Sequence, residues 1–231
     1  MEPWSIDAVQ VRYDGELDVH PRVAYLALNY VDRFLSKRQL PCEHKTWAPR
    51  LLAISCLSLA SKMQRAAAIS VADIQRGEEF MFDEATIRRM ERVVLGALEW
   101  RARSVTPLAF LGFFLSACFP QPRHPPLLAA IKARAVDLLL RVQPEVKMAE
   151  FAPSVTAAAA LLAAAGEVAG AHIPAFHAVV AACPFVNSVS MIFMNFVSSK
   201  ITPLIPTYLR SNPCHVWHSP ARRLLVFHFH I

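Results

Sequence analysis

The sequence predicts an all-α protein, and three observations carry that prediction. Apolar residues recur at every third or fourth position along most of residues 21–187, which is the spacing of one face of a helix. The 231-residue chain holds only 6 glycines, and no segment combines strand-like alternation with hairpin turns. Hydrophobic residues make up 55% of the chain and charged residues 18%, a balance that supports a packed core.

The first predicted helix begins at Pro21, because proline suits the first turn of a helix, where its missing N–H is not needed. Its apolar stripe runs to Leu35, and Pro41 follows its end. Ser70 to Asp73 has the pattern of a capping box and predicts a short helix. Asp83 is the expected N-cap of a longer helix over residues 84–98.

A helix over about residues 45–63 is predicted to lie at the centre of a domain. Between Arg50 and Lys62 the sequence LLAISCLSLAS contains no charge and leaves the helix without a polar face. A helix that is apolar on all sides is usually surrounded by other helices. We therefore expect Leu52, Cys56 and Leu59 to be almost fully buried.

The second half of the chain repeats this order of helices. Thr106 and Pro107 together mark a helix start, and further helices are predicted over 127–142, 152–168 and 174–183. The helix over 152–168 is rich in alanine and leucine and is again expected to be central. The repeat lies in the helix pattern and not in residue identity, and it indicates two related helical units joined by a polar linker at 101–104.

Composition excludes several classes of function. No glycine-rich phosphate loop is present, and no apolar stretch approaches the roughly 20 residues of a membrane span. The net charge is +6, but residues 188–231 hold four bases and no acid, so the rest of the chain gives little reason to expect nucleic-acid binding. The five cysteines form no Cys-x-x-Cys pair, which favours a reduced, intracellular compartment. We expect no membrane association, no cofactor and no metal, the histidines of the tail included.

Four sequence motifs occur in order along the chain, namely 24–36 (AYLALNYVDRFLS), 59–63 (LASKM), 87–100 (IRRMERVVLGALEW) and 105–111 (VTPLAFL). They resemble motifs of the cyclin family and occur in the family's order. The first resembles the second helix of the cyclin box, the next the end of its third helix, the next its fifth helix and the last the start of a second cyclin fold. The sequences around Phe80 and Met90 look most like those of plant D-type cyclins.

This resemblance implies two consecutive five-helix cyclin boxes. The first lacks most of its first helix and the second lacks its last helix, because the flanking sequences do not match the family. We expect the last segment to be disordered and dispensable. The implied parts are a remnant N-terminal segment (1–21), a first cyclin fold that binds the kinase (22–103), a second cyclin fold (104–187) and an atypical tail (188–231).

The resemblance also implies a function. Cyclins are non-catalytic regulatory subunits that bind and activate a cyclin-dependent kinase, and D-type cyclins promote the G1/S transition. The implied partners are the kinase catalytic subunit and, through the complex, a retinoblastoma-related substrate. The implied location is the nucleus and also the cytoplasm. Two other functions stay open, namely a degenerate cyclin that binds without activating and a cyclin-fold scaffold in transcription.

Two residues match the kinase-binding pair of the family, Lys62 and Glu91. An ammonium can donate to kinase carbonyls and a carboxylate can accept from amides, so such contacts give orientation as well as affinity. We expect both side chains on one exposed surface, on helices packed side by side. The alternatives are a solvated helix terminus for Lys62 and an i,i+3 pair with Arg88 for Glu91. Trp47 and Trp100 are expected to be core aromatics.

Overall fold

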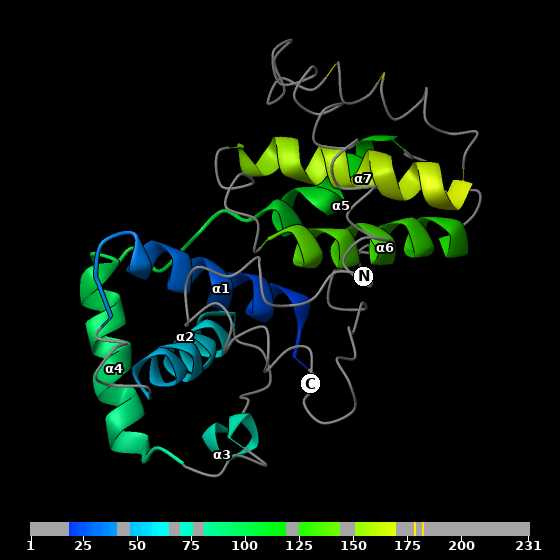
Figure 1. The fold of residues 1–231 in the computed structure, drawn as a ribbon. Helices are drawn as coiled ribbons and strands as arrows, with labels where there is room; N and C mark the ends of the chain where they lie inside the picture. Colours follow the sequence, from blue (N-terminus) through cyan, green and yellow to red (C-terminus); the bar gives the residue numbers. More distant parts are fainter. Residues whose placement is uncertain are drawn as a thin grey trace, which may run out of the picture. The chain divides into compact units, whose positions relative to one another are not determined.

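The structure is a computed structural model that describes residues 19–40, 47–64, 70–75, 81–118, 125–143 and 151–169, together with 178 and 182. Every regular element in these ranges is a helix, which confirms the all-α prediction (Figure 1). The tail over 188–231, most of the N-terminal segment and most of the expected helix over 174–183 lie outside the described residues. The helices are α1 (Pro21–Leu35), α2 (Ala48–Gln64), α3 (Val71–Ile74), α4 (Glu84–Ala97), α5 (Pro107–Cys118), α6 (Pro125–Val142) and α7 (Pro153–Ala169).

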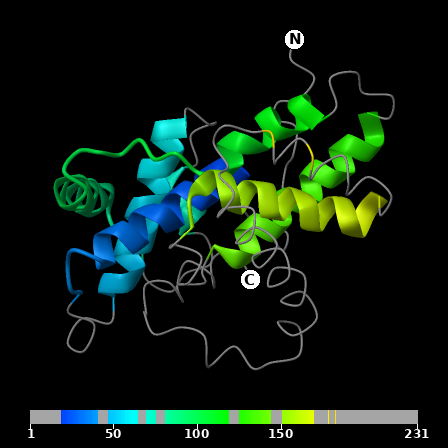
Figure 2. The same cartoon turned by 90° about the horizontal axis from the view of Figure 1, so that it is seen from above.

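The described residues fall into two compact units that divide between Ser104 and Val105. In the first unit, α2 packs against α1 on one side and α4 on another, and it also contacts α3. Figure 2 shows α4 along its axis while α1 is seen from the side, so α4 crosses α1 steeply. In the second unit, α7 packs against both α5 and α6.

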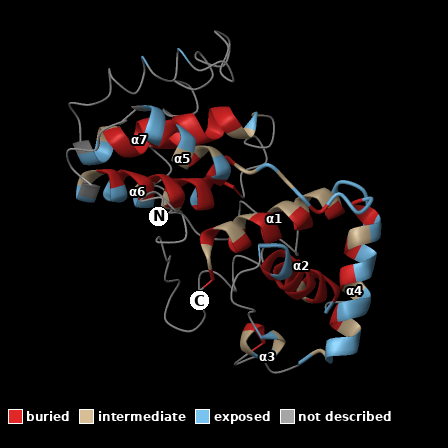
Figure 3. Cartoon of the chain, turned by 180° about the vertical axis from the view of Figure 1, so that it is seen from behind, coloured by how far each residue is buried: buried red, intermediate tan, exposed pale blue. Residues whose placement is uncertain are grey.

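The core of the first unit is built around α2. Every residue from Leu51 to Ser61 is buried, because this helix has no polar face to present to water (Figure 3). Leu52 and Cys56 are 0% exposed and Leu59 is 6% exposed, as predicted. Burial raises the pKa of the Cys56 thiol, which keeps it protonated as a small core residue.

Side chains close the first turns of three helices. The Nδ1 atom of His20 accepts a hydrogen bond from the Arg22 N–H at the start of α1. Ser70 Oγ accepts from the Ala72 N–H at α3, and Asp83 Oδ2 accepts from the Thr86 N–H at α4. The predicted caps at Ser70 and Asp83 are therefore present. They satisfy backbone donors that have no partner within the helix.

Hydrogen bonds from side chains of α1 hold the polar linker that follows α4. Tyr30 Oη donates to the Ala102 carbonyl at 2.6 Å, and burial raises the pKa of Tyr30 to about 12. The guanidinium of Arg33 donates to the Arg101 carbonyl and to Ser104 Oγ, both at 2.9 Å. These long-range bonds fix where the chain leaves the first unit.

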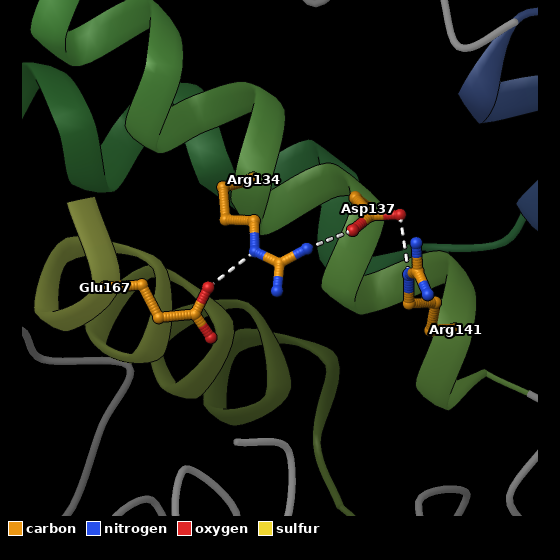
Figure 4. A network of polar contacts seen from close by, with 4 residues as sticks. All are labelled: Arg134, Asp137, Arg141 and Glu167. Carbon is orange, nitrogen blue, oxygen red and sulfur yellow. Dashed lines mark hydrogen bonds and ion pairs between the residues drawn. The ribbon is translucent and has the colours of Figure 1, made fainter. Parts of the chain in front are cut away.

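Alanine allows close packing in the second unit. Residues 154–165 of α7 are all buried, and most of them are alanine, which lets neighbouring backbones approach closely. Arg134 of α6 donates to Glu167 of α7 at 2.6 Å (Figure 4). Arg134 also pairs with Asp137, and Asp137 accepts from Arg141 at 2.8 Å. This network ties α6 to α7 at the edge of the apolar contact.

The prediction that Trp47 and Trp100 are core aromatics is wrong. Trp47 is 46% exposed and Trp100 is 71% exposed. Trp47 lies just before α2, and its ring contacts Phe82 with centroids 6.4 Å apart. Trp100 follows the end of α4 with a left-handed backbone, φ 60°, which turns its side chain away from the core. The prediction rested on the apolar character of the two side chains. Both residues lie beyond the helix ends, where helical periodicity no longer indicates which side chains face the core.

Candidate functional site between α2, α3 and α4

The structure brings Lys62 and Glu91 together although 29 positions separate them. Lys62 lies in the last turn of α2 and Glu91 in the middle of α4, and these two helices pack against each other. The Nζ atom of Lys62 donates to Oε1 of Glu91 at 2.6 Å and to Oε2 at 2.8 Å. The expectation that their helices lie side by side is confirmed.

The two side chains differ in exposure. Lys62 is 56% exposed, whereas Glu91 is only 10% exposed, so the carboxylate is less accessible than expected. Glu91 shares the inner side of α4 with the buried Ile87 and Val94. A carboxylate at such a depth requires a compensating charge, and the ammonium of Lys62 supplies it. The pair therefore presents a cation to solvent with an anion beneath it.

The structure does not contain the alternative pairing of Glu91 with Arg88. Arg88 Nη2 instead contacts Glu84 Oε1 at 2.8 Å, an i,i+4 pair along the outer side of α4. Lys62 does occupy a helix terminus, where a cation favours the helix dipole, but it also makes the interhelical bonds described above. Among the described residues, α4 therefore carries two ion pairs, one directed to α2 and one along its own surface.

These pairs line an open groove with a volume of about 370 Å³ between α2, α3 and α4. Ile87, 1% exposed, contributes an apolar side chain, while the two ion pairs supply charged groups. The groove combines apolar contact with hydrogen-bonding groups of both signs, which suits a segment of another protein. The lining residues are Ser58, Lys62, Ser70, Val71, Glu84, Ile87, Arg88 and Glu91.

A buried glutamine that the sequence did not point to helps to hold α4 in place. Gln75 Oε1 accepts from the Phe82 N–H at 2.7 Å, and Gln75 Nε2 donates to the Phe82 carbonyl at 3.1 Å. The Phe82 ring in turn lies 5.5 Å below the guanidinium of Arg50 on α2. These contacts anchor the residues just before α4 to α2. No local pattern in the sequence signals a side chain that bonds to backbone seven residues away.

Other kinds of site are not seen in the part of the chain that the structure describes. Within it, no cluster of three or more histidine, cysteine, aspartate or glutamate side chains could hold a metal ion. No described helix has the length and apolarity to cross a membrane.

Comparison with known proteins identifies the family. Residues 10–103 match the family model of the cyclin N-terminal domain. The chain is 87% identical over 179 residues to Cyclin-D6-1 of Oryza sativa subsp. japonica, which covers 78% of this chain and 56% of the relative. It is 44% identical over 177 residues to a putative Cyclin-D6-1 of Arabidopsis thaliana, covering 76% of this chain and 57% of the relative.

A third relative, Cyclin-D1-1 of Arabidopsis thaliana, is 43% identical over 149 residues, which cover 64% of this chain and 43% of the relative. The chain belongs to the cyclin family, and these relatives are plant D-type cyclins. It spans about half the length of the curated relatives that it matches.

Proposed function

We propose that the chain is a non-catalytic regulatory subunit that binds a cyclin-dependent kinase through the groove between α2, α3 and α4. The observation that carries the proposal is the Lys62–Glu91 pair. It joins two helices of a cyclin-family chain, and by sequence resemblance its two residues correspond to the family's kinase-binding pair. The pair lines the groove together with Ser58, a buried residue of α2.

The geometry indicates how the pair contributes to binding. An ammonium has three donors, and Glu91 takes two of those of Lys62, which leaves one for a kinase carbonyl. The carboxylate keeps further lone pairs for a kinase amide. Because each side chain already holds the other in place, little rotamer freedom is lost when the kinase binds. The pair thus gives directional, charge-assisted contacts at low entropic cost.

In this proposal the chain supplies no chemical group to the phosphoryl transfer that the kinase catalyses. Its binding energy selects the active conformation of the kinase, in which the ion pair between the β3 lysine and the C-helix glutamate is formed. The finer proposals rest on the resemblance to D-type cyclins. The complex promotes the G1/S transition and phosphorylates a retinoblastoma-related substrate. The chain is located in the nucleus and also in the cytoplasm.

Co-purification with a plant cyclin-dependent kinase, followed by a kinase assay on a retinoblastoma-related fragment, tests the proposal. We expect a stable complex and phosphorylation well above that of the kinase alone. A complex without stimulation supports the alternative of a degenerate cyclin that binds without activating. Failure to form a complex with a kinase that binds a full-length D-type cyclin in parallel contradicts the proposal.

A further inference from the structure

A second charged surface lies at the other end of α4, away from the groove. It is formed by the end of α1 and the residues that follow each of α1 and α4. One acid in it contacts two cations, and three further arginines belong to the same two segments. Trp100 lies within it. We call this surface the basic corner, and it consists of Arg33, Lys37, Arg38, Glu99, Trp100, Arg101 and Arg103.

Hydrogen bonds and ion pairs show that the two segments of the basic corner lie together. Lys37 Nζ donates to Glu99 Oε1 at 2.5 Å, and Arg101 Nε lies 3.9 Å from Glu99 Oε2. Arg33 donates to the Arg101 carbonyl at 2.9 Å. One carboxylate is therefore shared by two cations, and the corner keeps a clear positive excess. Residues 36–38, which follow α1, and residues 99–101, which follow α4, are exposed (Figure 3).

The backbone at this corner is strained. Glu99 and Trp100 both adopt left-handed backbone angles, with φ values of 54° and 60°. Such angles favour glycine and are unusual for a residue as bulky as tryptophan. The turn is closed by a hydrogen bond from the Trp100 N–H to the Leu95 carbonyl at 2.9 Å. The strained turn carries a largely exposed indole ring in the same segment as Glu99 and Arg101, and strain of this kind concentrates at functional sites.

We propose that the basic corner binds an acidic segment of a partner protein. Lysine and arginine side chains pair with carboxylates, and an exposed tryptophan adds apolar contact at low conformational cost. Nucleic acid is the less suitable ligand, because the cations belong to two short segments that offer a single exposed aromatic ring for stacking, and they do not follow an extended phosphate backbone. The corner is about eight residues along α4 from Glu91, roughly 12 Å, so it does not depend on the groove.

Fluorescence anisotropy with a fluorescein-labelled oligoglutamate peptide and the full chain tests this inference. We expect binding that weakens with salt. A double variant that carries Lys37→Gln and Arg101→Gln should bind the peptide roughly fivefold more weakly. Arg141→Gln on α6 is the matched control, since Arg141 is as exposed as Lys37 (both 45%), and it should leave binding unchanged.

The Trp100→Gly variant distinguishes a loss of peptide affinity from a loss of stability. Glycine relieves the left-handed strain, so this variant should raise the thermal midpoint and still weaken peptide binding. The inference is overturned if Trp100→Gly binds the peptide as tightly as the unaltered chain. It is also overturned if Arg141→Gln loses as much peptide affinity as the double variant of Lys37 and Arg101. Tighter binding of a single-stranded oligonucleotide than of the peptide overturns the assignment to a protein partner.

Discussion

At the residue scale, Trp100 shows how a single position can oppose the stability of the fold. Its left-handed backbone costs about 1–2 kcal/mol for a residue with a Cβ atom, and its ring is too exposed to recover that cost by burial. We predict that Trp100→Gly increases the free energy of unfolding by about 1 kcal/mol. Urea unfolding measures this change. A decrease in stability contradicts the account and indicates that the ring makes contacts that hold the turn.

Leu59 represents the opposite case, a residue that stabilises the core. It is 6% exposed on a helix that is surrounded by α1 and α4. Leu59→Ala should lower the free energy of unfolding by about 2–5 kcal/mol, because a cavity remains where the side chain was. Val93→Ala on α4, at a position 53% exposed, is the control and should change it by less than about 0.5 kcal/mol. Similar effects at the two positions contradict the central place of α2.

At the scale of elements, α4 depends on the cap at Asp83. Hydrogen bonds from the Thr86 side chain and then its backbone N–H lower the pKa of Asp83. The folded protein therefore binds this proton less readily than the unfolded chain, so the stabilisation is present above the ordinary aspartate pKa of 3.8 and is lost as the pH falls through the lowered pKa.

The midpoint of thermal unfolding, followed from neutral pH to about pH 3, measures this effect. The stabilisation by the Asp83 carboxylate begins to be lost near the ordinary aspartate pKa. Asp83→Asn keeps a capping oxygen but cannot titrate, so its midpoint should fall less on acidification than that of the unaltered chain. Asp83→Ala should lower the midpoint already at neutral pH. An Asp83→Asn variant with the same acid dependence as the unaltered chain contradicts the role of this carboxylate.

Helical periodicity and capping residues predicted the elements well, because both depend on neighbours a few positions away. The starts of α1, α3, α4 and α5 followed from Pro21, Ser70, Asp83 and Thr106 with Pro107, and the buried α2 followed from its lack of charge. Contacts between distant segments could not be derived in this way. The bond between Gln75 and Phe82, the depth of Glu91 and the exposure of Trp100 all depend on tertiary packing and on turns between helices.

The candidate site was predicted only in part. Family resemblance indicated Lys62 and Glu91, but periodicity and charge spacing favoured a local pair between Glu91 and Arg88. The structure instead pairs Arg88 with Glu84 and directs Glu91 to α2. The third side of the groove, formed by Ser70 and Val71, had only a capping signal in the sequence.

At the scale of the whole molecule, the chain is a cyclin-family protein in which the matched N-terminal domain contains the candidate kinase groove. In the proposed function, the Lys62–Glu91 pair serves kinase binding and not folding. Removing both charges leaves no uncompensated carboxylate, so Lys62→Ala with Glu91→Ala should change the thermal midpoint little. Removing Lys62 alone should be more destabilising, because the buried Glu91 then lacks its cation.

The affinity of the chain for a cyclin-dependent kinase measures what the pair contributes to binding. The control is Arg134→Ala with Glu167→Ala, another interhelical ion pair at 2.6 Å in the second unit. We expect the double variant of Lys62 and Glu91 to bind the kinase about tenfold more weakly or worse, while the control binds like the unaltered chain. Unchanged kinase affinity in the Lys62 and Glu91 variant, with its fold intact, would contradict the account.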